Sequence, residues 1–188
     1  MRIWTLVLCA VSVAACSREQ KESSPVASSA QPSSAPAVRA APAPAAAKHM
    51  TVALGKCEFS FDASVPLTAA TDNSSDRAVF TGPSDIGFAA YREEGERAKV
   101  GARSLEDLVK KAERAGKVQW LVKKTINGSH LAVWDKAGAE LHDEEAIEGE
   151  GVGTASTSAL LCSFKCNGPR ARQKEVVDLC TSVRVTVK

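Results

Sequence analysis

The sequence predicts an α+β fold in which an antiparallel sheet carries two helices and disulfides staple the domain. Three observations lead to this prediction. Residues 57–62, CEFSFD, alternate apolar and polar side chains, which is the period of a half-buried strand. Asn127-Gly128 separates two strand-like runs, which predicts a β-hairpin. Four cysteines remain in residues 50–188 behind a leader of the kind that directs export, so disulfides are expected there.

The leader also predicts a membrane anchor. Residues 1–15 carry one charge, Arg2, before an apolar run that ends in small residues, as in a secretory signal peptide. The stretch Val13-Ala14-Ala15-Cys16 resembles the bacterial lipobox, which implies cleavage before Cys16 and acylation of that cysteine. Ser17 stands where an aspartate would suggest retention in the inner membrane, so the outer membrane is the expected location. The alternative is an ordinary leader that leaves Cys16 free.

Residues 16–49 predict a tether. Ala, Ser and Pro dominate this stretch, and too little apolar surface is present to offset the entropy of ordering it. Direct binding of the tether to peptidoglycan or to a partner is the alternative. Residues 50–188, some 139 residues, are then one globular domain.

Charge is nearly balanced overall and uneven locally. The formal charge of +2 falls to +1 once the leader is removed, which gives no global field for nucleic acid. Residues 99–124 hold eight basic and three acidic side chains, whereas residues 140–150 hold six acidic ones and no base. We expect a protein partner in the periplasm to meet one of these patches; a solvated helix face and a flexible acidic loop are the alternative. The candidate contact residues are Lys110, Lys111, Arg114, Glu144, Glu145 and Glu148.

The elements follow in chain order. After the strand at 57–62, the runs at 77–81 and 86–91 predict further strands, broken by Gly82-Pro83-Ser84. Ser104 as N-cap, Asp107 three residues later and Gly116 at the end delimit a helix. The apolar face of this helix is expected from Leu105, Leu108, Val109 and Ala112.

The second half begins with the Asn127-Gly128 hairpin. Trp120 and Trp134 are expected on neighbouring strands, where aromatic pairs more often fill a core than line a ligand groove. A strand through TSALLCSF, a helix near 170–179 and a closing strand SVRVTV complete the domain. His130 follows the turn and is expected to face solvent.

Strand and helix dimensions rank the cysteine pairings. Cys162 and Cys166 on one extended strand lie roughly 13 Å apart, which is beyond the ~7 Å reach of a disulfide. If a helix fills the interval from Cys166 to Cys180, those two lie roughly 20 Å apart. We therefore expect Cys57 to pair with Cys166 and Cys162 with Cys180, unless a turn in SFKC brings Cys162 and Cys166 together. A metal site or a redox pair is the competing interpretation, but the C-x3-C spacing lacks the thioredoxin-like form.

A family resemblance emerges from the order of these features. A Phe-bearing first strand, a helix introduced by SLEDL, a central Asn-Gly hairpin and a C-terminal helix running into CTSVRVTV resemble the Mog1/PsbP-like α+β sandwich. The resemblance covers most of residues 55–188 and contains no diagnostic motif. This resemblance implies a binding or assembly protein without catalysis. Some bacterial proteins of that fold resemble immunity lipoproteins. The four cysteines of the domain depart from that pattern.

Catalytic and cofactor signals are sparse. The sequence contains no G-x-S-x-G, no H-E-x-x-H and no phosphate-binding glycine loop, so no catalytic residue and no cofactor is predicted. His142 with Asp143, Glu144 and Glu145 is the one candidate for weak binding of a divalent ion, and we expect no metal site. The expected function is that of a non-enzymatic lipoprotein that binds another protein, for example as an immunity or inhibitor protein. An assembly or structural role in an envelope complex is the alternative.

Overall fold

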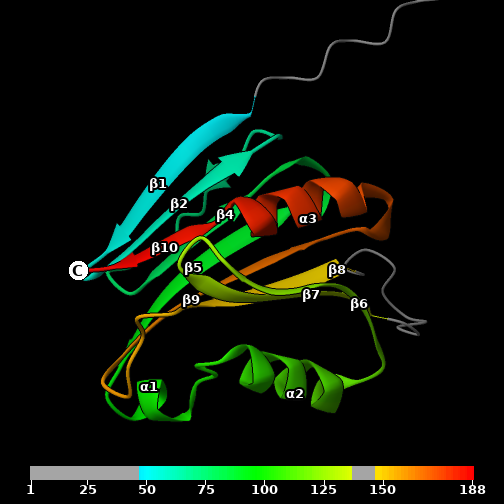
Figure 1. Ribbon diagram of the computed structural model, residues 1–188. Coiled ribbons are helices and arrows are strands. Elements are labelled where there is room, and N and C mark those ends of the chain that lie inside the picture. Colours follow the sequence, from blue (N-terminus) through cyan, green and yellow to red (C-terminus); the bar gives the residue numbers. More distant parts are fainter. Residues whose placement is uncertain (1–46, 137–146) are drawn as a thin grey trace, which may run out of the picture. The chain divides into compact units, whose positions relative to one another are not determined.

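The computed structural model describes residues 47–136 and 147–188, which fold as α+β (Figure 1). The elements in chain order are β1 (Lys48–Leu54), β2 (Cys57–Ala63), β3 (Thr68–Ala69), β4 (Arg77–Thr81), η1 (Pro83–Asp85), β5 (Gly87–Glu94), α1 (Glu96–Val100), α2 (Leu105–Ala115), β6 (Val118–Ile126), β7 (Ser129–Lys136), β8 (Ile147–Gly153), β9 (Leu160–Gly168), η3 (Arg170–Arg172), α3 (Gln173–Ser182) and β10 (Arg184–Val187). The predicted fold class is confirmed, with one difference. The described strands form two antiparallel sheets where the sequence suggested one.

The two sheets are unequal in size. The smaller has the order β1-β2-β10, and the larger has the order β3-β4-β5-β9-β8-β7-β6. Helix α3 and the three-stranded sheet pack on one side of the seven-stranded sheet, which we call its inner face. Helices α1 and α2 lie against the opposite side, its outer face (Figure 1). The seven-stranded sheet is thus the central layer.

The main core lies between the two sheets and α3. Strand β2 alternates as predicted, so Cys57, Phe59 and Phe61 are all buried. The ring of Phe61 lies 4.0 Å from the ring of Phe88 on β5, measured between centroids. A buried aromatic pair of this kind contributes beyond the area that it removes from water, so these rings join the two sheets.

The predicted hairpin is formed by β6 and β7. Asn127 and Gly128 both adopt a positive φ, +54° and +75°, as a two-residue turn of this handedness requires. The Asn127 side-chain amide donates to the Thr181 carbonyl at 3.2 Å, and the Asn127 carbonyl accepts from the Val185 backbone N–H. The hairpin tip is therefore bound to the end of α3 and to β10.

The predicted disulfide pairing is wrong. Cys57 pairs with Cys162, and Cys166 pairs with Cys180. Cys162 and Cys166 do lie on one extended strand, β9, as expected. However, the interval from Cys166 to Cys180 is not filled by one helix. Strand β9 continues to Gly168, and after η3 the chain reverses, so that α3 packs back against β9 and brings the two Cα atoms within 5.9 Å.

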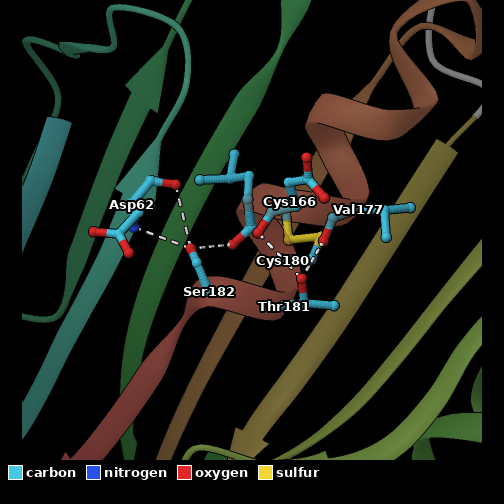
Figure 2. Close-up of a disulfide and its surroundings, with 8 residues drawn as sticks. Asp62, Cys166, Val177, Cys180, Thr181 and Ser182 are labelled. Atoms are coloured by element: carbon cyan, nitrogen blue, oxygen red, sulfur yellow. Dashed lines mark hydrogen bonds between the residues drawn. A yellow bond between two sulfur atoms is a disulfide. The ribbon is translucent and has the colours of Figure 1, made fainter. Parts of the chain in front are cut away.

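The end of α3 is held to the three-stranded sheet (Figure 2). The Ser182 hydroxyl accepts from the backbone N–H of Asp62 on β2 at 3.0 Å and lies 2.8 Å from the Leu179 carbonyl. Figure 2 shows this contact beside the Cys166–Cys180 bridge. Two links on one helical turn, one to each sheet, therefore fix the position of α3.

Two strands differ from the sequence prediction. Strand β1 begins at Lys48, two residues before the expected domain boundary, and pairs along its length with β2. Strand β8 occupies the stretch that was expected to end the acidic loop. Within the described residues, no helix is both long and apolar enough to cross a membrane.

Candidate binding surface around helix α2

Helix α2 begins and ends where the sequence predicts. The Ser104 hydroxyl accepts from the Asp107 backbone N–H at 3.1 Å, and the Asp107 carboxylate accepts from the Ser104 backbone N–H at 3.2 Å. This reciprocal arrangement satisfies two donors that a helix start otherwise leaves open. The Ser104 hydroxyl, together with the backbone N–H groups of Arg103 and Ser104, holds the pKa of Asp107 below its usual 3.8.

The apolar side of α2 fixes which side chains face solvent. Leu108 and Ala112 are buried against β6 and β7, where they pack with Trp134. Because neighbouring side chains on a helix lie about 100° apart around its axis, Lys110, Lys111 and Arg114 are left on the exposed surface.

A groove with a volume of about 440 Å³ runs along this exposed surface. Its wall residues come from α1, from the α1–α2 connection and from α2. They are Lys99, Val100, Gly101, Ala102, Arg103, Asp107, Lys110, Lys111 and Arg114. Five of them are cationic, and the only acid among them, Asp107, is committed to the capping box. We call this the basic groove.

The cations of the basic groove are only partly neutralised. Lys99 contacts Glu96 and Lys110 contacts Glu106, each at 2.5 Å. The hydrogen bond and the charge of Glu106 raise the pKa of Lys110. Among the described residues, Arg114 has no hydrogen-bond or ion-pair partner, and Val100 is 86% exposed. The groove therefore presents net positive charge beside an exposed aliphatic side chain.

Lys111 separates the basic groove from a second hollow. This cavity, with a volume of about 250 Å³, lies between α2 and the outer face of the seven-stranded sheet. Both carboxylate oxygens of Glu150 accept from the Lys111 ammonium, at 3.0 and 2.7 Å. Lys165 contacts the same carboxylate at 3.1 Å from the adjacent strand. Only 14% of the Glu150 side chain is exposed, so this carboxylate is held between two ammonium groups.

Glu150 also affects the pKa of Lys165. Partial burial works against the charged form, but the attraction and hydrogen bond of Glu150 outweigh it, and the pKa of Lys165 is raised. Lys165 is therefore a cation throughout the physiological pH range, and its side chain is about half exposed.

Of the three acidic candidates, only Glu148 lies among the described residues. Glu144 and Glu145 lie outside the described residues, as do His142 and Asp143 of the weak ion site. Glu148 does not lie in a loop but on the outer face of β8, where it contacts Lys136 of β7. The sequence EGEGVG alternates glutamates on the outer face with glycines on the inner face, so the expected loop is a strand here.

The two tryptophans contribute to packing. Trp120 and Trp134 face each other across β6 and β7, with ring centroids 5.8 Å apart, and Trp134 is buried. The Lys123 ammonium lies 5.0 Å from the Trp120 ring centroid. His130 is half-exposed on β7, and its ring Nδ1 lies 2.8 Å from the hydroxyl of the exposed Thr125. In the part of the chain that is described, no three His, Cys, Asp or Glu side chains gather in a metal-binding arrangement.

Sequence reasoning did not single out Glu93, Glu150 or Lys165 as site residues. They come from β5, β8 and β9, and β5 is distant in sequence from the other two strands, so the three residues meet through sheet pairing. The charge alternation in β8 was the one local signal for this cavity.

Comparison of the chain with family models, with curated proteins and with solved structures found no match. The resemblance to the Mog1/PsbP-like sandwich therefore stays a prediction.

Proposed function

We propose that this protein is a lipoprotein, anchored to the outer membrane through Cys16, whose domain binds another protein in the periplasm through the basic groove. The observation that carries the proposal is the groove itself, which places five cationic side chains beside the exposed Val100. The leader and the tether support the location. The proposal assigns no catalysis to the domain.

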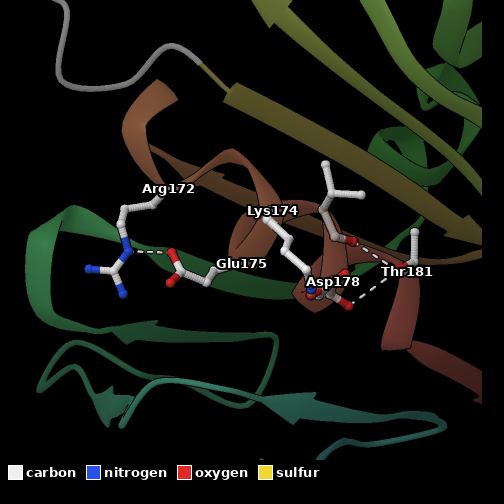
Figure 3. Close-up of polar contacts among 6 residues, drawn as sticks. Arg172, Lys174, Glu175, Asp178 and Thr181 are labelled. Atoms are coloured by element: carbon white, nitrogen blue, oxygen red, sulfur yellow. Dashed lines mark hydrogen bonds and ion pairs between the residues drawn. The ribbon is translucent and has the colours of Figure 1, made fainter. Parts of the chain in front are cut away.

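Charge distribution supports α2 as the binding element. The charges near the start of α3 pair with one another, Arg172 of η3 with Glu175 and Lys174 with Asp178 (Figure 3). Such pairs leave little net field. Three of the five cations of the basic groove also have acidic partners, but Arg103 and Arg114 form no ion pair with a described residue. The groove therefore retains an excess of positive charge, which attracts an acidic surface and directs its approach.

Val100 supports a protein as the partner. Protein interfaces place apolar contacts at the centre of a polar rim, and the basic groove has this composition on a small scale. The near-balanced total charge of the chain gives no comparable support to nucleic acid. We therefore infer a partner that presents acidic side chains around an apolar one.

Affinity capture from native envelopes tests the proposal. The full-length chain, expressed in the cells it comes from, is compared with a Lys110→Glu/Arg114→Glu variant. Wild type should retain one protein in equimolar amount. The variant should retain at least about tenfold less of it, because replacing two cations by anions is expected to cost at least about 1.4 kcal/mol of binding free energy, which is a factor of ten in affinity. Lys111 is left unchanged so that Glu150 keeps both of its lysine partners.

Lys174→Glu is the matched control, because it reverses a lysine on α3, away from the basic groove. It should capture the partner as wild type does, and capture should weaken as salt is raised. Equal capture by all three chains, or by none, contradicts the proposal. A secreted toxin as the captured protein identifies an immunity role, whereas a component of an envelope complex identifies an assembly role.

A further inference from the structure

The cavity on the sheet side of α2 has the size of a small-molecule site. Its volume is about 250 Å³. An engineered cavity of about 150 Å³ accepts benzene, so a somewhat larger molecule fits here. The cavity shares Gly101, Ala102 and Lys111 with the basic groove and otherwise has its own walls. What it binds is thus a separate question from the protein partner.

Part of the wall is aliphatic. Leu108 of α2 faces Val152 and Leu161 of the outer sheet face, and Ala102 adds a methyl group. Removal of apolar surface from water favours binding. This wall therefore favours a ligand with an aliphatic side chain.

The charged groups lie at separate places along the cavity. Glu93 on β5 is half-buried, and no described residue forms a hydrogen bond or ion pair with it. Lys165 on β9 and Lys111 on α2 surround Glu150, which leaves one net positive charge there. Glu93 is opposite Leu161, four residues from Lys165 on β9, which is about 13 Å along an extended strand.

Two residues that carry hydroxyl groups occupy strand positions midway between those of Glu93 and Lys165. Tyr91 on β5 is directly opposite Ser163 on β9, two residues from Glu93 and two residues from Lys165. Both side chains line the cavity. Hydroxyl groups both donate and accept hydrogen bonds, so this pair can serve the N–H and the C=O of one peptide unit.

We propose that this cavity binds a short aliphatic peptide of about two residues with both termini free, its amino group at Glu93 and its carboxylate at Lys165 and Lys111. Two extended residues span roughly 7 Å. A hydrogen bond of roughly 2.8 Å at each end extends this length to about 13 Å, which matches the separation of the Glu93 and Lys165 positions along the strands. A ligand with only one charge would leave the opposite end of the cavity without a counter-charge.

The test is calorimetric titration of the full-length chain, solubilised in detergent, with three probes. They are L-alanyl-L-leucine, its N-acetyl form, which lacks the ammonium, and its C-terminal amide, which lacks the carboxylate. The free dipeptide should bind, and each blocked form should bind at least about tenfold more weakly, because a hydrogen bond to a charged group contributes about 1.5–3 kcal/mol.

Two substitutions assign the two ends. Glu93→Gln should weaken binding of the free dipeptide and remove its advantage over the N-acetyl form. The advantage of the free dipeptide over the amide should remain. Lys165→Gln should do the reverse. Glu113→Gln and Lys174→Gln, which change the same residue types outside the cavity lining, should bind as wild type does. These control variants also keep the total charge change equal.

Absence of binding by the free dipeptide at millimolar concentration overturns the proposal. Equal binding of all three probes, or binding that Glu93→Gln and Lys165→Gln leave unchanged, overturns it as well. Because Lys110 and Arg114 are untouched in these variants, capture of the protein partner should persist. Failure of the peptide site is therefore distinguishable from failure of the basic groove.

Discussion

At position 149 a methyl group has no room. Gly149 lies on the inner face of β8, and an added Cβ would come within 2.5 Å of the Cys180 sulfur and 3.2 Å of the Val133 side chain. Its neighbours Glu148 and Glu150 point to the outer face. One strand thus places charge on the outer face and glycine where α3 approaches.

We predict that Gly149→Ala destabilises the protein by about 1–3 kcal/mol, the usual cost of overpacking a core. Urea unfolding of the oxidised protein gives this value from the shift in midpoint at constant slope. The same substitution should cost clearly less in a Cys166→Ala/Cys180→Ala background, because the nearest sulfur is then absent. An equal cost in both backgrounds would mean that the disulfide does not restrict the space for a side chain at position 149.

Strand β8 also contains core positions that could not be predicted from the sequence. Glycine has no apolar side chain, so a hydrophobic pattern does not register Gly149 and Gly151 as core positions. The atoms that fill their space belong to Phe164 and to the disulfide, which are supplied by β9 and α3. The Lys165–Glu150 contact is likewise a cross-strand pair, which no local pattern indicates.

At the scale of elements, α2 depends on its N-terminal cap. We predict that Ser104→Ala lowers the free energy of unfolding by about 1 kcal/mol, as for other capping serines. Thermal or urea unfolding at neutral pH measures the loss. Ser75→Ala is a suitable control, because Ser75 is an exposed serine outside the helices. A loss no larger than that of the control would contradict a stabilising cap.

The cap also predicts a dependence on pH. The folded-state pKa of Asp107 is lowered below 3.8, so its contribution to stability is present above about pH 4 and is lost as pH falls through the lowered value. The stability difference between wild type and Asp107→Asn should therefore shrink from neutral pH toward pH 3. A stability difference that grows as pH falls would contradict a stabilising role of the Asp107 carboxylate in the cap.

Elements with local signals were predicted well. The capping box and the Asn-Gly turn are each encoded within a few residues, so α2 and the β6–β7 hairpin begin and end close to where the sequence places them. The three-stranded sheet was missed as a separate layer because β2 pairs with β10, more than a hundred residues later in the chain. The hydrophobic periodicity of a strand does not indicate which distant strand it pairs with.

At the scale of the whole molecule, the two disulfides have different roles. Cys57–Cys162 joins the three-stranded sheet to the seven-stranded sheet and closes a sequence separation of 105 residues. Cys166–Cys180 joins β9 to α3 across a separation of 14 residues. The four cysteines and their oxidised state were predictable, whereas the pairing depended on the chain reversal after Gly168.

We predict that replacing Cys57 and Cys162 by alanine costs about 4–5 kcal/mol, and that replacing Cys166 and Cys180 costs about 3 kcal/mol, because the larger loop restricts the unfolded chain more. Denaturant unfolding of the two double variants gives the comparison. Non-reducing peptide mapping should find the same two bridges in wild type. A bridge between Cys57 and Cys166, or the opposite order of costs, would contradict the architecture.

The function proposed for the whole molecule depends on where a partner touches it. Val100 lines the basic groove, and Lys174 lies on α3 across the central sheet. Both side chains are exposed, at 86% and 87%, so a photo-crosslinking amino acid at either position leaves the core intact. The pair therefore compares the groove with a surface whose charges are already neutralised.

Photo-crosslinking in intact cells at positions 100 and 174 is the most direct measurement of this claim. The account predicts one discrete product from position 100, of the chain joined to a single protein, which is absent at position 174 and lost when Lys110→Glu and Arg114→Glu are added. No product at position 100, or the same products at both positions, would contradict a partner bound at the basic groove.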